Sequence, residues 1–410
     1  MYEDVAYELV DTPEGFSRAA GVLAGGRGPL AIDTERASAY RYDDRAFLVQ
    51  IHRRDAGTFL IAPEGHRDAA RAALAPVVNG TEWILHAASE DLTALALLGL
   101  HPGRLFDTEL AARLAGFERP NLGAMVQHFT GVELEKGHGQ EDWSLTPLPA
   151  EWLEYAALDV VYLSDLAEAL TEVLAGQELL DAAEEEFAHL VATRSVARPA
   201  QKTWRDVKGV GSIRTRAGLQ LARELWAARN EEARRRDVSP SRVLPTSVLA
   251  DVAKAVPASP RELAKVRGFP ARRRGAAEEW FGHIQRALEA PQRTWPQPVP
   301  RDPATPPKRT AWERIHPESW AVLARCRELV AEAARGMGVR PEDLLPPAVL
   351  REEVWRSAEE LDPAATPRWG RAPRDTDYVA RRLAAAGARP WQVGIAAPLI
   401  ARAYWEAAEG

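Results

Sequence analysis

Five side chains in three separate parts of the sequence have the types and spacing needed to hydrolyse a phosphodiester. Asp33 and Glu35 lie two residues apart at the end of an apolar run, so in a strand both point to one face. Asp91 lies at the start of an apolar helical segment, and Tyr155 and Asp159 lie four residues apart, which puts them on one helix face. Four converging carboxylates favour hard cations such as Mg²⁺ or Mn²⁺. Two such ions about 4 Å apart suit in-line hydrolysis, with the tyrosine hydroxyl positioning the attacking water.

Each of these residues also has a purely structural interpretation. A carboxylate such as Asp91 in the first turn of a helix complements the helix dipole, and this alone would explain it. Tyr155 could be a core residue with its hydroxyl in water. The combination of all five residues favours the catalytic interpretation over the structural one.

The elements that would position these residues form a mixed α/β domain over residues 1–200. Short apolar or alternating runs predict a three-stranded meander at 29–35, 46–52 and 58–62, and a further buried strand at 83–87. Helical periodicity predicts helices at 65–78, 89–98, 107–115 and 121–129, and one long helix from Pro149 towards Leu174. We therefore expect a mixed sheet covered by helices.

Strand signals disappear after residue 200, and the rest of the chain is expected to be all-α. Seven prolines between 291 and 310 predict an extended linker over 291–311. The Leu-Pro segment Leu244–Leu249 recurs as Leu345–Leu350 on the other side of this linker. This repeat predicts two related helical modules, at 201–290 and 312–410.

The charge is unevenly spread between these parts of the chain. Residues 1–200 hold 15 Lys and Arg against 33 Asp and Glu, a net charge of −18, whereas residues 201–290 hold 19 against 10, a net charge of +9. The acidic part suits divalent cations and the basic part suits a polyanion, although both charge sets could simply be solvated helix faces.

Cysteine content and hydropathy exclude several other classes of protein. The single cysteine, Cys326, excludes an internal disulfide and a zinc site built on several thiolates, and it fits a reducing compartment. The longest apolar runs are far shorter than the ~20 residues that a membrane-spanning helix needs. We therefore expect a soluble, cytoplasmic protein that acts without a membrane.

At this point the sequence resembles a known family. Asp33-Thr34-Glu35, the segment His86–Asp91 and the segment Tyr155–Asp159 resemble the three exonuclease motifs of the DEDD superfamily, tyrosine subgroup, and most of all those of ribonuclease D. Phe106-Asp107-Thr108 and Asp142-Trp143-Ser144 occur in the order that this family shows. The resemblance implies a ribonuclease-H-like exonuclease fold.

The resemblance continues downstream and has one departure. Trp226–Arg229, the Leu-Pro segment and Leu263–Phe269 resemble a helicase-and-RNase-D C-terminal (HRDC) domain at 201–290, and the last hundred residues resemble a divergent second copy. Arg36 is the departure, because ribonuclease D usually has an aromatic residue after the acidic pair. This difference could alter contact with the terminal nucleotide.

The resemblance implies a role for each of the five residues. Asp33, Glu35, Asp91 and Asp159 are expected to bind two divalent cations, Mg²⁺ or Mn²⁺, and Tyr155 to orient the nucleophile. The implied activity is 3′-5′ exoribonuclease action that releases nucleoside monophosphates from tRNA precursors or other structured RNA, by a protein expected to be a monomer. The alternatives are a 3′-5′ DNA exonuclease and a nucleic-acid-binding scaffold that has lost catalysis.

Cationic residues provide candidate contacts to nucleic-acid phosphates. These candidates are Lys136, in a loop before the catalytic helix, and two arginine triplets in the basic module, Arg234, Arg235 and Arg236, and Arg272, Arg273 and Arg274. The alternative for each is a solvated loop or helix end.

Overall fold

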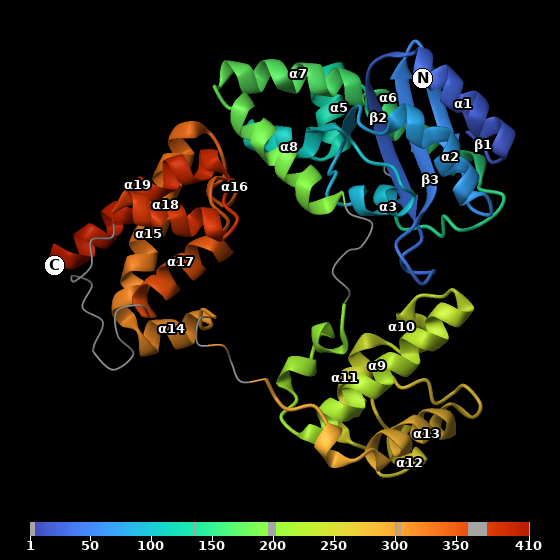
Figure 1. Ribbon diagram of the computed structural model, residues 1–410, viewed down its shortest axis with the longest axis vertical. Helices are drawn as coiled ribbons and strands as arrows, with labels where there is room; N and C mark the ends of the chain where they lie inside the picture. Colours follow the sequence, from blue (N-terminus) through green and yellow to red (C-terminus); the bar gives the residue numbers. More distant parts are fainter. Residues whose placement is uncertain are drawn as a thin grey trace.

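The computed structural model describes residues 5–134, 137–195, 202–299, 302, 305–359 and 375–409. It has an α/β region at the N-terminal end and two all-helical regions after it (Figure 1). The predicted fold class, a mixed sheet covered by helices and followed by helical modules, is therefore confirmed. None of the helices in these described ranges has both the length and the apolar character that crossing a membrane requires.

A six-stranded sheet organises the α/β region. Its strands are β1 (Tyr7–Val10), β2 (Arg27–Arg36), β3 (Ala46–Arg54), β4 (Gly57–Ile61), β5 (Glu82–Leu85) and β6 (Arg104–Asp107), in the spatial order β1-β4-β3-β2-β5-β6. β2, β3 and β4 pair antiparallel, which confirms the predicted meander. β1, β5 and β6 pair parallel with their neighbours. The sequence prediction missed β1 and β6.

Helices cover both faces of the sheet because successive residues of each strand are buried on opposite sides. Along β4, Phe59 and Ile61 pack in the core that contains Phe16 of α1 (Pro13–Gly25), whereas Leu60 packs with Leu153 of α6 (Ala150–Val161). The other helices of this region are α2 (Arg67–Val78), α3 (Leu92–Leu97), α4 (Thr108–Leu114), α5 (Leu122–Thr130), α7 (Leu163–Gly176) and α8 (Leu180–Arg194).

The prediction of one long helix from Pro149 towards Leu174 is wrong. The chain forms two helices, α6 and α7, which meet at Tyr162. Leu153 and Ala156 of α6 pack in the cluster with β3 and β4, whereas Leu166 and Leu170 of α7 pack in the other main core. Val160 of α6 and Leu163 of α7 share a third cluster between these two, so the break lies where the buried side of the chain passes from one core to the other.

The remaining elements are nearly all helical. The region after residue 200 contains α9 (Arg216–Arg236), α10 (Pro240–Val243), α11 (Thr246–Ala255), α12 (Pro260–Leu263) and α13 (Ala276–Glu289). The C-terminal region contains α14 (Arg309–Ile315), α15 (Pro317–Met337), α16 (Pro341–Leu344), α17 (Pro347–Glu359), α18 (Thr376–Ala385) and α19 (Pro390–Glu409). α14 begins at Arg309, inside the segment predicted to be linker.

The two helical regions repeat one arrangement. α9 and α15 both have 21 residues, and each is followed by a four-residue helix that starts with proline and then by a Leu-Pro step into the next helix. Leu244 has φ −149° and ψ 118°, and its counterpart Leu345 has φ −149° and ψ 116°. This matching backbone supports the prediction, made from the Leu-Pro repeat, that the regions are related.

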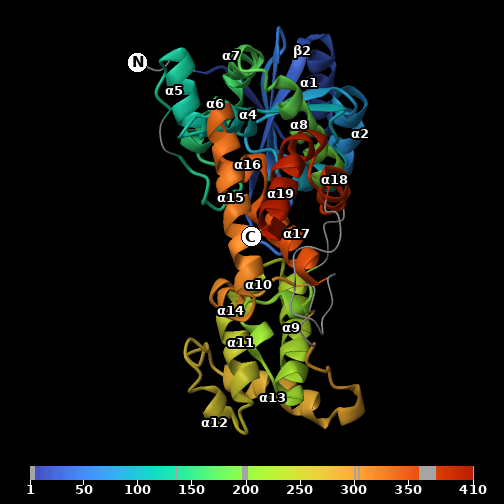
Figure 2. The same cartoon turned by 90° about the vertical axis from the view of Figure 1, so that its left-hand side faces the viewer.

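The two helical regions meet the α/β region differently. α19 packs beside α8, Arg389 pairs with Glu186 at 2.6 Å, and the C-terminal core is continuous with that of the sheet. The region α9–α13 has a core of its own and lies at the opposite end of the molecule from the sheet (Figure 2). It touches the α/β region through Asp237, which pairs with Arg45 at 2.7 Å.

Candidate active site

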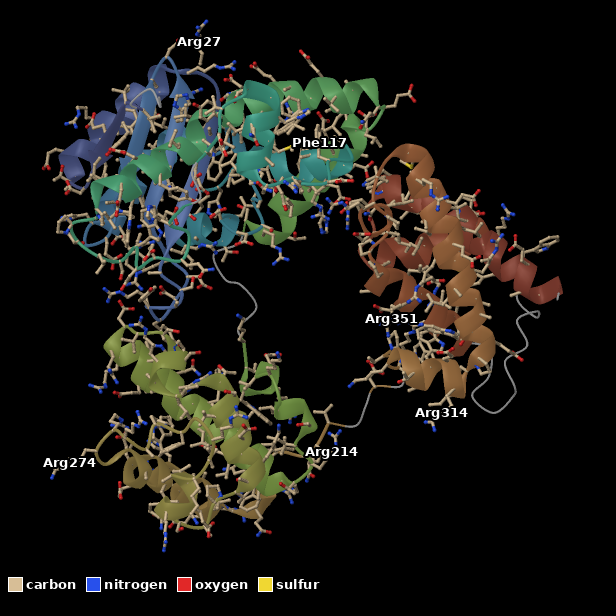
Figure 3. All side chains as sticks on the ribbon, turned by 180° about the vertical axis from the view of Figure 1, so that it is seen from behind. Arg27, Phe117, Arg214, Arg274, Arg314 and Arg351 are labelled. Atoms are coloured by element: carbon tan, nitrogen blue, oxygen red, sulfur yellow. The ribbon has the colours of Figure 1, made fainter. Side chains whose placement is uncertain are left out.

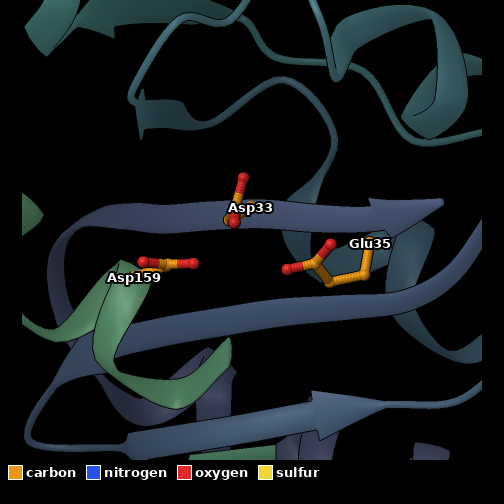
Figure 4. Close-up of side chains that lie close together, drawn as sticks. All are labelled: Asp33, Glu35 and Asp159. Carbon is orange, nitrogen blue, oxygen red and sulfur yellow. The ribbon is translucent and has the colours of Figure 1, made fainter. Parts of the chain in front are cut away.

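Three acidic side chains converge beside β2, an inner strand of the sheet. Asp33 and Glu35 project from β2, and Asp159 projects from α6, which packs on the sheet beside β2 (Figure 4). One carboxylate oxygen from each lies within 4.8 Å of the other two. The two strand acids that the sequence places on one face therefore meet the predicted helix acid Asp159 in one group of oxygens.

Asp91 lies beside this group but is not part of it. It occupies the N-cap position of α3 and makes no side-chain hydrogen bond to the helix. Instead, its Oδ1 accepts a 2.6 Å hydrogen bond from Oγ1 of Thr34, the residue between the two strand acids. Its charge also raises the pKa of Asp33 and of Glu35, so the helix-dipole interpretation does not account for its surroundings.

The carboxylates resist ionisation without a cation. Burial, followed by repulsion from Asp159 and Asp91, raises the pKa of Glu35 to about 9. Burial likewise raises the pKa of Asp91 and that of Asp159 to about 7, and the pKa of Asp33 lies well above its usual range. Carboxylate oxygens are the ligands that hard divalent cations prefer, and such cations would offset the negative charge that burial disfavours here.

Tyr155 lies one helical turn before Asp159 and faces the same site. Burial, and then the charge of Asp159, raises the pKa of its hydroxyl well above the usual range, so the phenol keeps its proton at neutral pH. The backbone of Gly137 lies against the tyrosine ring, because a Cβ added there would come within 1.8 Å of Tyr155 Cε2. The His138 ring makes an edge contact with Tyr155, with centroids 5.7 Å apart.

Asp107 holds the backbone of the segment that leads to Asp91, a role that the sequence analysis did not assign. Its carboxylate accepts hydrogen bonds from the amides of Ala87 at 3.1 Å and Ala88 at 2.8 Å, and it also caps α4. Ala87 has φ 58°, a left-handed conformation that a non-glycine residue rarely adopts without such support. The sequence signal was an aspartate directly before a helix, which is typical of an N-cap.

His86 and Arg36 border the site without joining the carboxylate group. His86 Nδ1 lies 2.9 Å from Thr108 Oγ1, and burial lowers the histidine pKa to about 4, so the ring is neutral. Arg36 pairs with Glu90 at 3.2 Å, and its charge opposes the rise in pKa of Glu35 and Asp91.

Most of the arginines predicted to contact phosphates have acidic partners. Glutamates pair with four of the six, Arg234 with Glu231, Arg235 and Arg236 with Glu232, and Arg273 with Glu279. Arg272 and Arg274 are exposed in the turn before α13 and form no ion pair with any residue that the structure describes. The remaining candidate, Lys136, lies outside the described residues. A role of these side chains in RNA binding stays a prediction.

Known proteins match this chain along most of its length. Family models for a 3′-5′ exonuclease, an HRDC domain and a 3′ to 5′ exonuclease C-terminal domain match residues 7–175, 218–276 and 305–404. Ribonuclease D of Gluconacetobacter diazotrophicus is 31% identical over 317 residues, which cover 76% of this chain and 77% of the relative. Ribonuclease D of Escherichia coli is 30% identical over 292 residues, covering 70% and 76%. The chain belongs to the ribonuclease D family.

Membership of the ribonuclease D family establishes that the chain is a 3′-5′ exoribonuclease. This family uses divalent metal ions, and the acidic cluster is consistent with that. The comparisons favour neither the DNA exonuclease nor the inactive scaffold.

Solved structures agree with the fold. A crystal structure of a protein from Bifidobacterium adolescentis aligns with a TM-score of 0.81 and 32% identity, covering 98% of this chain and 97% of that one. Escherichia coli RNase D aligns with a TM-score of 0.67 and 24% identity, covering 88% and 93%, which is a likeness of fold.

Proposed function

We propose that the chain removes nucleotides from RNA 3′ ends by metal-assisted hydrolysis at the acids of β2, α3 and α6. The observation that carries this proposal is the approach of Asp33, Glu35 and Asp159 to within 4.8 Å of one another. Such proximity is unfavourable for three negative charges that are buried or half-buried, and bound cations would relieve it.

In this proposal each acidic residue is a metal ligand. Asp33, Glu35, Asp91 and Asp159 would hold two ions, Mg²⁺ or Mn²⁺, both of which carboxylates serve well. Such ions, when bound, supply an activated water and stabilise the leaving oxygen. Tyr155 keeps its proton at neutral pH because its pKa is raised, and its hydroxyl donates a hydrogen bond to Asp159. The phenol oxygen would then accept a hydrogen bond from the attacking water and orient it.

The proposed substrates are tRNA precursors or other structured RNAs, cleaved to nucleoside monophosphates by a monomeric protein. Escherichia coli RNase D is described as an exoribonuclease involved in structured RNA processing, which supports this class. Residues 201–290, with 19 basic and 10 acidic residues, would attract the RNA backbone. Arg272 and Arg274 are the best placed of the predicted arginines, because no described acid pairs with them.

We also propose four parts for the chain, namely an exonuclease domain at 1–200, an HRDC domain at 201–290, a linker at 291–311 and a second HRDC-like domain at 312–410. The separate core of α9–α13 and the repeated backbone at the Leu-Pro steps support this division.

The deciding experiment compares Asp33→Asn and Asp159→Asn with wild type. RNA labelled at its 3′ or 5′ end and matched DNA are incubated with Mg²⁺ or Mn²⁺, with and without chelator. We expect wild type to release mononucleotides from the RNA 3′ end only with metal. Both variants should lose at least a thousandfold in rate, an order expected from losing a catalytic ion (about 4 kcal/mol).

A matched control removes a carboxylate elsewhere in the same region. Asp165→Asn on α7 removes an exposed acid that pairs with Arg54 at 2.9 Å, and it should cleave at the wild-type rate. RNA affinity should stay within a fewfold of wild type in all three variants. Normal turnover by both site variants would overturn the assignment of the metal ligands.

A further inference from the structure

Two tryptophans form a fixed platform at the start of the C-terminal region. Trp312 on α14 is fully buried, and its Nε1 donates a 2.8 Å hydrogen bond to Ser319 Oγ. Trp320 on α15 is partly exposed and makes an edge contact with Trp312, with ring centroids 6.1 Å apart. We call these two residues the tryptophan pair.

Three arginines from three different helices gather around the tryptophan pair. The guanidinium carbons of Arg309 and Arg327 lie 5.8 and 5.3 Å from the Trp320 ring centroid. The guanidinium carbon of Arg351 on α17 lies 6.0 Å from the Trp312 ring centroid. These distances are typical of cation–π contacts, which orient a guanidinium without neutralising it. We call the three residues the arginine cluster.

The arginine cluster has no acidic partner among the residues that the structure describes. Other arginines of the same region do have one, since Arg325 and Arg402 pair with Glu406, and Arg356 pairs with Glu352. Within the cluster, Arg351 uses one donor on the carbonyl of Pro307, at 2.8 Å. A guanidinium has five N–H donors, so most of the cluster's donors remain for an external acceptor.

Like charges held this close repel one another. Burial, followed by the charges of Arg351 and Arg309, lowers the pKa of Arg327. A cluster of cations without acidic partners is electrostatically unfavourable until an anion binds. This property is typical of a phosphate-binding surface.

We propose that the arginine cluster binds backbone phosphates of RNA, with the tryptophan pair holding the guanidiniums in place. The proposal rests on the RNA exonuclease function above. It adds a second RNA-binding surface, besides the basic region 201–290. Figure 3 labels Arg351 and Arg314 at the end of the C-terminal region that lies away from the sheet. Only an RNA long enough to extend well beyond the active site would reach the cluster, so binding there favours long substrates over short ones.

The test measures the affinity of the full-length protein for a tRNA-sized transcript at several salt concentrations, by fluorescence anisotropy with Ca²⁺ replacing the catalytic metal. The triple variant Arg309→Gln, Arg327→Gln, Arg351→Gln should weaken binding at least tenfold at low salt. Its slope of log affinity against log salt should fall by about 0.7 to 0.9 for each phosphate that the cluster no longer neutralises. The charge-retaining triple change to lysine should recover most of this slope.

The matched control removes the same charge from the same region. Arg325→Gln, Arg356→Gln and Arg402→Gln together remove three arginines that already have acidic partners, and this triple variant should keep the wild-type salt slope. If both triple variants reduce the slope equally, or neither does, the arginine cluster is not a phosphate site.

Cleavage of a trinucleotide separates this proposal from the proposed function. A trinucleotide bound at the carboxylates cannot reach the cluster, so both triple variants should cleave it at the wild-type rate in Mg²⁺. Failure of the wild type to cleave it would count against the catalytic assignment, whereas an unchanged transcript affinity would count against the arginine cluster alone.

Discussion

Thr34 donates a 2.6 Å hydrogen bond from its Oγ1 to Oδ1 of Asp91, and both side chains are buried. Thr34 belongs to β2 and Asp91 is the N-cap residue of α3, so the bond joins the strand that carries Asp33 and Glu35 to the start of α3. The bond stabilises the ionised form of Asp91 against the burial that raises its pKa. Thr34 therefore both positions Asp91 and keeps its carboxylate available for a cation.

Thr34→Val should impair metal binding with little change of shape. Valine fills the same volume but cannot donate to Asp91, so the carboxylate loses a partner while remaining 4% exposed. We expect half-maximal cleavage to need about 10 to 100 times more Mg²⁺, which is the effect of removing a hydrogen-bond partner of a metal ligand. Thr58→Val is the control, because Thr58 is also a buried strand threonine but bonds His52 at 2.9 Å. Equal effects of the two changes would remove the special role of Thr34.

Gly137→Ala should disable the catalytic tyrosine from outside the motif. A Cβ at Gly137 would lie 1.8 to 2.5 Å from three ring atoms of Tyr155, so the ring or the loop must shift. A displacement of about 1 Å can cost about 100-fold in rate, and RNA affinity should be retained. Gly139→Ala is the matched control in the same loop, since a Cβ there meets nothing within 4 Å. We expect Tyr155→Phe to fall in the same range as Gly137→Ala, and wild-type turnover by both would mean that Tyr155 is structural.

The fold around the site follows from local sequence signals only in part. The meander β2-β3-β4 was predicted correctly because its strands are consecutive in the sequence and each contains a short apolar run, with polar turns between the strands. β1 and β6 were missed because each is a four-residue strand at the edge of the sheet with only two apolar residues in a row, whereas β5 contains the apolar run Trp83-Ile84-Leu85. The break at Tyr162 was missed because helical periodicity does not reveal where the buried side passes from the core beside β3 and β4 to the other main core.

The site, too, could be predicted only where local sequence spacing determines it. Asp33, Glu35, Tyr155 and Asp159 could be predicted, because strand and helix spacing put each pair on one face. The hydrogen bond that positions Asp91 could not be predicted, because Thr34 lies 57 positions before Asp91 in the chain. The arginine triplets illustrate the same limit, since the sequence shows their charge but not the glutamates that pair with them.

Metal-free protein should lose stability as the pH rises. Glu35, Asp91 and Asp159 have pKa values raised to about 9, about 7 and about 7, so the folded state keeps protons that the unfolded chain has already released. The unfolding free energy contributed by these groups is therefore greatest near pH 4 and falls as the pH passes through the folded-state values.

Thermal unfolding followed from about pH 5 to about pH 9 in chelator should show this decline in Tm. Saturating Mg²⁺ should restore stability at the upper end, by about 2.7 kcal/mol at a concentration 100 times its Kd. Asp159→Asn, which lacks one of these charges, should show a shallower decline and a smaller response to Mg²⁺. A Tm that rises through this interval in chelator would contradict the raised pKa values.

Asp237→Asn should loosen the contact between α9 and the α/β region. Asp237 ends α9 in a left-handed conformation, φ 47°, and pairs with Arg45 at 2.7 Å, while the next turn is joined by the amide of Ser239 donating to Tyr40 O at 3.0 Å. Asparagine also tolerates a left-handed backbone, so the change removes the charge and keeps the turn. The Asp237 side chain is 39% exposed, so the expected loss is about 1 kcal/mol or less.

Amide hydrogen exchange at Ser239 measures this loosening directly, because that amide is protected only while the two regions remain in contact. A loss of up to about 1 kcal/mol corresponds to exchange that is up to about fivefold faster. Asp251→Asn is the control, since Asp251 pairs only at 3.8 Å with Lys254 in its own helix and should leave Ser239 protected. Removing the partner instead, with Arg45→Gln, should reproduce most of the effect, although Asp237 also pairs with Arg41 at 3.4 Å. Combining it with Asp237→Asn should add less than the sum of the two single changes, because both delete the pair of Arg45 with Asp237. Fully additive effects in the double variant would mean that each residue acts through other contacts and that the pair does not couple the regions.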